Sequence, residues 1–543
     1  MKFPDKHYLR ILLLFIGLIV VSCSAIWSVE YYFNQDGSPH LYNAYLILEL
    51  LKGNDSIAQF AMLNPHLVPN LTGHWILAFL LVIFEPATAT KIMVTLTFAL
   101  FVASVGWLRF QVAGKEGLGT ALLLGTVLAF NWLWFWGFYN YILAATCFSF
   151  SLGLWWRWRQ KMNFLRFLIL FPLLIFTFYS HLISFGFLIA AIGFLLTANY
   201  KSIPKKSAAW TVAVIASTMP LLINYLYFGH TGGAIEPEWN YLKNPLSISN
   251  WWTHFVATDP FSLISRKAVP FVEFTSPVFA LFSSTLSLVI ALLLLAHGTF
   301  GSNKAQKRNL ISEQKSWIVL AMILIMIWAL GPDGFGKVHG GFLRERTLIL
   351  ALVCFVPFFR INGNRVILLG AQACLILIIL FQTLVLWDYA HYAEPLGKQF
   401  LEAKDHIGPN DSVGSIIFVS NTRRFRPMPL SNITPLLGIG KNAPIWDNFE
   451  FGNYYFPVVT KTSDEREFVF NFRESNTYDL NDPNENVAEK RSRLESVLIA
   501  NHNQIDILLV WNEQPDFDSL REKWFEIDPY FESAELKLFK HRR

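Results

Sequence analysis

The chain has 543 residues, of which 53% are hydrophobic and only 15% are charged, and its formal net charge is +5. A soluble globular domain carries about 25% charged residues, and a disordered chain would hold far fewer than the 19 Trp, 18 Tyr and 49 Phe found here. The basic residues form no single stripe, so the sequence gives no support to a nucleic-acid partner. The composition predicts a protein that crosses a membrane several times.

The apolar residues fall in blocks that are long enough to cross roughly 30 Å of hydrocarbon as helices. The first block follows Lys2, Lys6 and Arg10, which is typical of a first span with a cytoplasmic N-terminus or of a cleaved signal. The many later spans favour the membrane anchor. The predicted spans are 11–28, 68–84, 88–110, 118–135, 141–156, 164–179, 184–198, 208–228, 278–300, 317–330, 347–359 and 366–386.

Basic residues gather in alternate connections, at 157–166, 201–206, 304–308 and 360–365. The positive-inside bias places these connections in the cytoplasm. The loops 29–67 and 229–277 and everything after Trp387 then face the other side. A cytoplasmic N-terminus and an external C-terminus require an odd number of crossings, so thirteen spans are preferred over twelve. The discrepancy lies between residues 30 and 88, where the sequence hides either a further span or a re-entrant helix.

The composition changes near Tyr389, where Asp, Asn, Arg, Glu and Pro become frequent. We therefore predict a polytopic all-α membrane domain over 1–388 and a soluble extracytoplasmic α/β domain over 389–543. Within the latter, the pattern predicts buried strands at 413–420 and 505–511, a helix at 484–501 and a terminal strand at 535–540.

The first external loop is the richer candidate for chemistry, because ionisable groups held at a membrane surface are functional candidates. Ser38 is a natural N-cap and Pro39 a natural first residue of a helix that runs to Lys52. Asp36 would lie just before this helix, where it either supports the helix start or acts as a general base or metal ligand. His40 and, further on, His66 are candidate substrate-binding residues.

A second cluster lies at the outer end of the span 317–330. Basic residues on the outer side run against the positive-inside bias, so an anionic ligand such as a phosphate would compensate them. The alternative is that Glu345 and Asp333 pair with these residues, or that they reach ordinary lipid headgroups. His181, at the outer end of the span 164–179, is a further candidate for the same pocket. The cluster consists of Lys337, His339, Arg344 and Arg346.

The chain resembles the GT-C superfamily of membrane glycosyltransferases, which use polyprenyl-phosphate-linked sugars and include protein O-mannosyltransferases, oligosaccharyltransferases and aminoarabinose transferases. The resemblance rests on the basic N-terminus, the many spans, the external tail, the segment Gln35-Asp36-Gly37-Ser38-Pro39-His40 and the element Asn64-Pro65-His66. It implies that Asp36 is the base and that Arg344 or Arg346 clamps the donor phosphate. Asp36 has no adjacent second carboxylate, so metal dependence is open. A divalent cation, Mg²⁺ or Mn²⁺, would bind at Asp36.

The resemblance implies an inverting transfer of a sugar from a polyprenyl-phosphate donor to an extracytoplasmic glycan, lipid or protein, in a bacterial inner membrane. One alternative is a transporter or flippase for lipid-linked glycans, which would place ionisable residues deep within several spans. Another is a glycan polymerase or ligase that uses a diphosphate donor, for which Arg266 and Lys267 would supply further external charge.

Overall fold

The computed structural model describes residues 6–228, 237–239, 260–261, 263, 292, 304–335, 340–358, 365–419, 425–480 and 485–542. The predicted span 278–300, apart from residue 292, and the candidates Lys337, His339, Arg266 and Lys267 lie outside these residues. The chain divides into two compact units. Unit 1 comprises Met1–Ala25, Val94–Ile264 and Val269–Trp387, and unit 2 comprises Ile26–Met93, Ser265–Ala268 and Asp388–Arg543.

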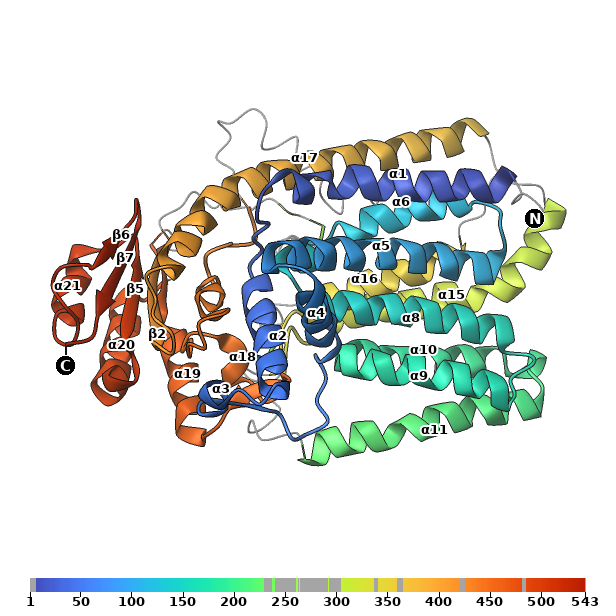
Figure 1. The fold of residues 1–543 in the computed structure, drawn as a ribbon. Coiled ribbons are helices and arrows are strands. Elements are labelled where there is room, and N and C mark those ends of the chain that lie inside the picture. The colour runs from blue at the N-terminus through green and yellow to red at the C-terminus, as the bar shows by residue number, and fades with distance from the viewer. Residues whose placement is uncertain are drawn as a thin grey trace. The chain divides into compact units, whose positions relative to one another are not determined.

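Unit 1 is helical, and its long helices lie side by side (Figure 1). Three of its helices, α1, α5 and α17, also have residues in unit 2. The helices are α1 (Lys6–Ser28), α5 (Pro86–Ala113), α6 (Leu118–Ala129), α7 (Trp132–Trp136), α8 (Tyr139–Trp158), α9 (Phe164–Ser180), α10 (Leu182–Ala198), α11 (Lys205–Phe228), α15 (Lys304–Leu330), α16 (Leu343–Phe355) and α17 (Arg365–Lys404), with short 3₁₀ turns at Tyr200–Ser202 and Val356–Phe358.

Four of the described helices, α1, α5, α11 and α17, are long and apolar enough to cross a membrane, and five shorter apolar helices accompany them. Large apolar side chains are exposed on three of the four, for example Leu13 (59%) on α1, Ile223 (63%) on α11 and Val366 (75%) on α17. Exposed apolar surface of this extent is what lipid covers. The chain is an integral membrane protein, while the count of thirteen spans and the orientation stay predictions.

Three predicted spans that lie in unit 1 or enter it differ clearly from the observed helices. The span 118–135 is two helices, because Asn131 breaks the first and its side chain caps α7 by accepting from Trp134 N. The helix α15 begins at Lys304 rather than 317. The helix α17 continues past 386 to Lys404, so the helix of the last predicted span runs on into the residues of unit 2. The apolar runs mark where helices meet lipid, and helix-forming polar residues then extend them beyond it.

The first part of unit 2 contains the predicted helix of the loop 29–67. The predicted span 68–84 is only the twelve residues of α4, about 18 Å of helix, which is shorter than the roughly 30 Å of hydrocarbon. The elements are α2 (Gly37–Leu51), α3 (Asp55–Ala58), β1 (Ala61–Leu63) and α4 (Thr72–Ile83).

The tail supplies a five-stranded sheet with the order β4-β2-β5-β7-β6. The strand β2 pairs in parallel with β4 and β5, and β7 is antiparallel to both β5 and β6. Every residue of β2 and β5 is buried, as expected for parallel strands covered on both faces. The predicted strands and helix are confirmed within two or three residues. The strands are β2 (Val413–Val419), β3 (Val458–Thr460), β4 (Thr477–Asp479), β5 (Ile507–Trp511), β6 (Phe531–Glu532) and β7 (Leu536–Lys540), and the helices are α18 (Phe449–Gly452), α19 (Ser463–Asn476), α20 (Val487–Asn501) and α21 (Pro515–Arg521), with 3₁₀ turns at Thr434–Gly438 and His502–Gln504.

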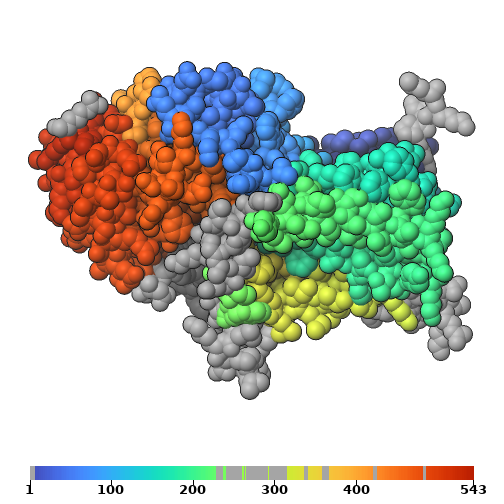
Figure 2. Space-filling view, turned by 90° about the horizontal axis from the view of Figure 1, so that it is seen from below, coloured from blue at the N-terminus to red at the C-terminus, as the bar shows by residue number. Residues whose placement is uncertain are grey.

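The two parts of unit 2 pack directly on each other. The strand β1 pairs antiparallel with β3, from Ala61 opposite Thr460 onward, and the Tyr42 hydroxyl of α2 donates to the Ala443 carbonyl at 2.6 Å. Figure 2 shows the blue surface of the early segment against the orange surface of the tail. The loop 29–67 and the tail therefore pack together within unit 2. Whether 1–388 and 389–543 are separate domains stays a prediction.

Candidate functional site

Asp36 lies at the N-terminus of α2, as predicted, but the cap position differs from the prediction. Asp36 itself is the N-cap, and the helix begins at Gly37 rather than after Ser38. The Asp36 side chain makes no capping hydrogen bond. Its Oδ1 instead accepts a hydrogen bond of 2.8 Å from the Asn432 amide of the tail. The Asp36 carboxylate therefore contacts a distant part of the chain rather than the N–H groups of its own helix.

The surroundings of Asp36 favour its protonated form. Burial raises the pKa of the Asp36 carboxyl from its ordinary value to about 6. The positive charge of His40, the hydrogen bond from Asn432 and the charge of Arg473 act in the opposite direction and only limit the rise. A carboxyl group with a pKa near neutrality is suited to exchange a proton at physiological pH.

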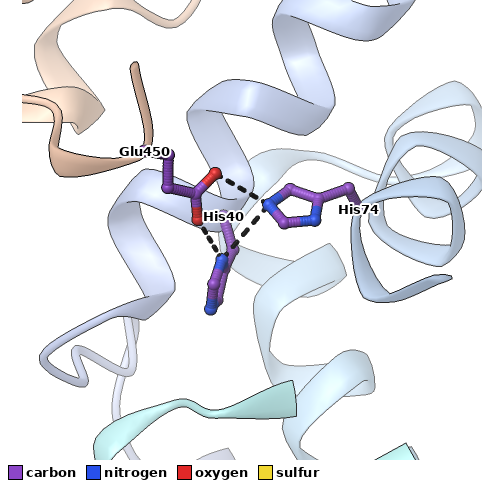
Figure 3. A group of neighbouring side chains, drawn as sticks. All are labelled: His40, His74 and Glu450. Carbon is purple, nitrogen blue, oxygen red and sulfur yellow. Dashed lines mark hydrogen bonds and ion pairs between the residues drawn. The ribbon is translucent and has the colours of Figure 1, made fainter. Parts of the chain in front are cut away.

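One turn further along α2, His40 belongs to a buried group of three residues that Figure 3 shows pointing toward one another. Its Nδ1 forms an ion pair with Glu450 Oε1 and lies 3.2 Å from His74 Nε2. His74 Nε2 in turn lies 2.8 Å from Glu450 Oε2. The three side chains come from α2, α4 and α18, so the group joins both parts of unit 2.

Two asparagines and a backbone carbonyl orient this group. Asn43 donates through Nδ2 to Glu450 Oε2, and Asn448 donates to Asn43 Oδ1 at 3.0 Å. His74 Nδ1 lies 2.8 Å from the Asn70 carbonyl. Burial alone would raise the pKa of Glu450, but the charges and hydrogen bonds of His74 and His40 outweigh it and lower the pKa to about 2. Glu450 is therefore a carboxylate at neutral pH.

Arg344 and Arg346, the described residues of the second predicted cluster, lie in unit 1, at the start of α16. Arg344 is buried, and its guanidinium contacts the end of α15 and the turn that follows. Nε donates to the Trp328 carbonyl at 2.6 Å, and Nη2 donates to the Ala329 carbonyl at 3.0 Å. Nη1 forms an ion pair with Asp333 at 3.3 Å. This arrangement is the pairing alternative raised from the sequence. Arg344 therefore has a structural task at the C-terminus of α15.

Arg346 has different neighbours. Its guanidinium carbon lies 5.2 Å from the centre of the Phe138 ring and 5.6 Å from that of Tyr141. The Tyr141 hydroxyl donates to the Arg346 carbonyl at 2.8 Å, and the Tyr141 ring packs edge-on against His181 at 5.5 Å. The structure thus brings Arg346 and His181 together around Tyr141, within unit 1.

The remaining candidate residues, His66, Lys337 and His339, add no further contact to either group among the described residues. His66 is exposed, and its backbone N–H donates to Asn64 Oδ1 at 3.0 Å, which is a local turn. Lys337 and His339 are outside the described residues. The predicted meeting of Asp36 with Arg344 and Arg346 involves both units and stays a prediction, as does a cation bound at Asp36.

The sequence missed His74, Glu450 and Asn432. His74 was hidden within the predicted span 68–84, although a histidine in a membrane segment is itself a functional signal. Glu450 and Asn432 lie in the polar tail, where no local pattern distinguishes them from solvent-exposed residues. Only their contacts with α2 mark them.

Comparison with known proteins gives similarity of structure only. No protein-family model and no curated protein match the chain. ArnT from Cupriavidus metallidurans, bound to undecaprenyl phosphate, is similar over 97% of this chain and 97% of its own, with 10% identity and a TM-score of 0.44. The archaeal oligosaccharyltransferase AglB from Archaeoglobus fulgidus, in complex with an inhibitory peptide and a dolichol-phosphate, is similar over 98% of this chain and 74% of its own, with 11% identity and a TM-score of 0.48. Both are of the kinds that the sequence resemblance names.

Proposed function

We propose that this protein transfers a sugar from a polyprenyl-phosphate donor to an extracytoplasmic acceptor, with inversion at the anomeric carbon and with Asp36 as the general base. The observation that carries the proposal is the Asp36 carboxylate: it is buried, it makes no capping hydrogen bond to α2, and the Asn432 amide donates to it at 2.8 Å.

The chemistry follows from these groups. The acceptor hydroxyl oxygen attacks the anomeric carbon, its proton passes to the Asp36 carboxylate, and the bond from that carbon to the phosphate oxygen breaks with its electron pair going to the phosphate. A base whose pKa is near 6 takes the proton efficiently at neutral pH. A cation near the leaving phosphate would stabilise the charge that develops there.

Among the predicted phosphate ligands, Arg346 fits this role better than Arg344. Arg344 uses its guanidinium on the end of α15, whereas the aromatic rings around Arg346 hold its guanidinium from the face. Stacking of this kind orients a guanidinium for planar recognition of an oxyanion. His181, beside Tyr141, would line the same phosphate or sugar position.

The test uses protein purified in detergent, a set of polyprenyl-phosphate sugars, and the release of polyprenyl phosphate as the readout. Asp36→Asn should lower turnover by about 100-fold or more, because general-base catalysis contributes that much. The matched control is Asp405→Asn, an exposed aspartate of the same unit, which should keep wild-type turnover. Normal turnover by a folded Asp36→Asn protein would remove Asp36 from the mechanism.

The same material distinguishes the alternatives. A flippase would move labelled polyprenyl-phosphate sugar across vesicle membranes without releasing polyprenyl phosphate. A polymerase or ligase would release polyprenyl diphosphate from a diphosphate-linked donor and remain inactive with the monophosphate.

We further propose a bacterial inner membrane with a cytoplasmic N-terminus, on the distribution of basic residues between connections.

A further inference from the structure

The buried group of His40, His74 and Glu450 offers one potential ligand atom from each residue, and these atoms all lie within 4.8 Å of one another. They are His40 Nδ1, His74 Nε2 and a carboxylate oxygen of Glu450. The side chains of His74 and Glu450 have no exposed surface, and that of His40 is 6% exposed. Such complete burial of two imidazoles and a carboxylate is costly unless the charges within the group are balanced.

The two ring nitrogens of His74 have different contacts. A carbonyl oxygen only accepts hydrogen bonds, so the contact of His74 Nδ1 with the Asn70 carbonyl at 2.8 Å places a proton on Nδ1. In the neutral ring, Nε2 then carries a lone pair. That lone pair is directed at Glu450 Oε2, 2.8 Å away, which as a carboxylate oxygen is also an acceptor. A histidine nitrogen and a carboxylate oxygen that face each other in this way are both atoms that a metal ion can bind.

The geometry and the surroundings of the group fit a bound metal ion. The two histidine nitrogens are 3.2 Å apart, close to the roughly 3.3 Å that separates two ligands held about 2.05 Å from a tetrahedral zinc ion. A metal-bound histidine usually donates its other ring N–H to a backbone carbonyl, as His74 does to Asn70. The Asn43 amide likewise fixes the Glu450 carboxylate.

We propose that His40 Nδ1, His74 Nε2 and the Glu450 carboxylate bind a divalent transition-metal ion of the zinc class. Imidazole nitrogens select such ions over Mg²⁺ or Mn²⁺, which prefer oxygen ligands. The ion joins α2, α4 and α18, and so fixes the start of α2, where the backbone N–H of His40 donates to the Asp36 carbonyl at 3.4 Å. The site stands on its own contacts and does not depend on the proposed transfer reaction.

The test begins with the metal content of the full-length protein, purified in detergent through a tag without histidines and analysed by mass spectrometry for transition metals, Mg and Mn. We expect about one zinc-class ion per chain, and below about 0.2 in His74→Gln and Glu450→Gln. The control His391→Gln changes an exposed histidine of the same unit and should keep the ion. Equal metal content in wild type and both variants would overturn the proposal.

A second measurement needs no variant and so is independent of whether the variants fold. Wild-type protein is stripped with a chelator and then titrated with Co²⁺, Zn²⁺ or Mg²⁺. We expect visible absorption typical of tetrahedral Co²⁺, saturating near one equivalent, and a rise in melting temperature with Zn²⁺ but not with Mg²⁺. Absence of both signals, or a response to Mg²⁺ alone, refutes the site. Asp36→Asn should lose transfer yet keep the metal, which separates this proposal from the catalytic one.

Discussion

A glycine of α17 controls how closely the segment that carries Asp36 approaches this helix. A Cβ added at Gly397 would lie 2.6 Å from Cδ2 of Phe33 and closer still to Cε2 and Cζ. Phe33 is 2% exposed and stacks on Tyr31 with 4.5 Å between ring centres. The ring has little room to retreat, so Gly397→Ala must shift the segment or the helix.

The magnitude comes from two opposing effects. Overpacking a filled core costs about 1–3 kcal/mol, while replacing glycine by alanine within a helix gains about 1 kcal/mol. Gly370 provides the matched control, since it lies in the same helix and a Cβ there would meet nothing within 4 Å. Gly397→Ala should therefore be less stable than Gly370→Ala by about 1–3 kcal/mol, the helix gain being common to both.

The assay is denaturant unfolding of the purified protein in mixed micelles, followed by tryptophan fluorescence. Phe33→Leu should relieve the clash, so the Gly397→Ala/Phe33→Leu cycle should show a favourable coupling of about 1 kcal/mol or more. Gly397→Ala as stable as Gly370→Ala, or a coupling below about 0.5 kcal/mol, would refute the close approach as the reason for the glycine. If Phe33 moves as argued, Gly397→Ala will also lose transfer activity, because Asp36 follows three residues later.

Two further pairs of variants separate structural from functional residues. Tyr42→Phe removes the buried hydrogen bond to the Ala443 carbonyl and should lower the unfolding free energy by about 1–3 kcal/mol. Tyr45→Phe removes a partly exposed hydroxyl and should lower it by less than about 1 kcal/mol. Equal losses in the two variants would contradict this ranking. Arg344→Lys should lower the thermal unfolding midpoint by breaking buried contacts at the end of α15. Arg346→Lys should leave that midpoint nearly unchanged and raise the KM for the lipid-linked donor, and the reverse pattern would exchange the two roles.

The sequence alone determined the features that depend on neighbouring residues. The apolar runs predicted most helices of unit 1, because hydropathy and helical length are local properties. The polar start of α2 put Asp36 just before a helix, and continuous apolar runs predicted β2 and β5. Local pattern failed at helix ends, as with α17, where helix-forming residues continue after the apolar run stops.

The tertiary structure decided which side chains meet. Asp36 and Asn432 are 396 residues apart in the chain, and His74 and Glu450 are 376 apart. These partners meet because β1 pairs with β3 and because α2 and α4 pack against α18 and the turns around it. No periodicity links residues at such separations, since their contact depends on the packing of whole elements rather than on the sequence near either residue. The sequence supplied a carboxylate and a histidine at the start of one helix, and only the folded tail gave them Asn432 and Glu450 as partners.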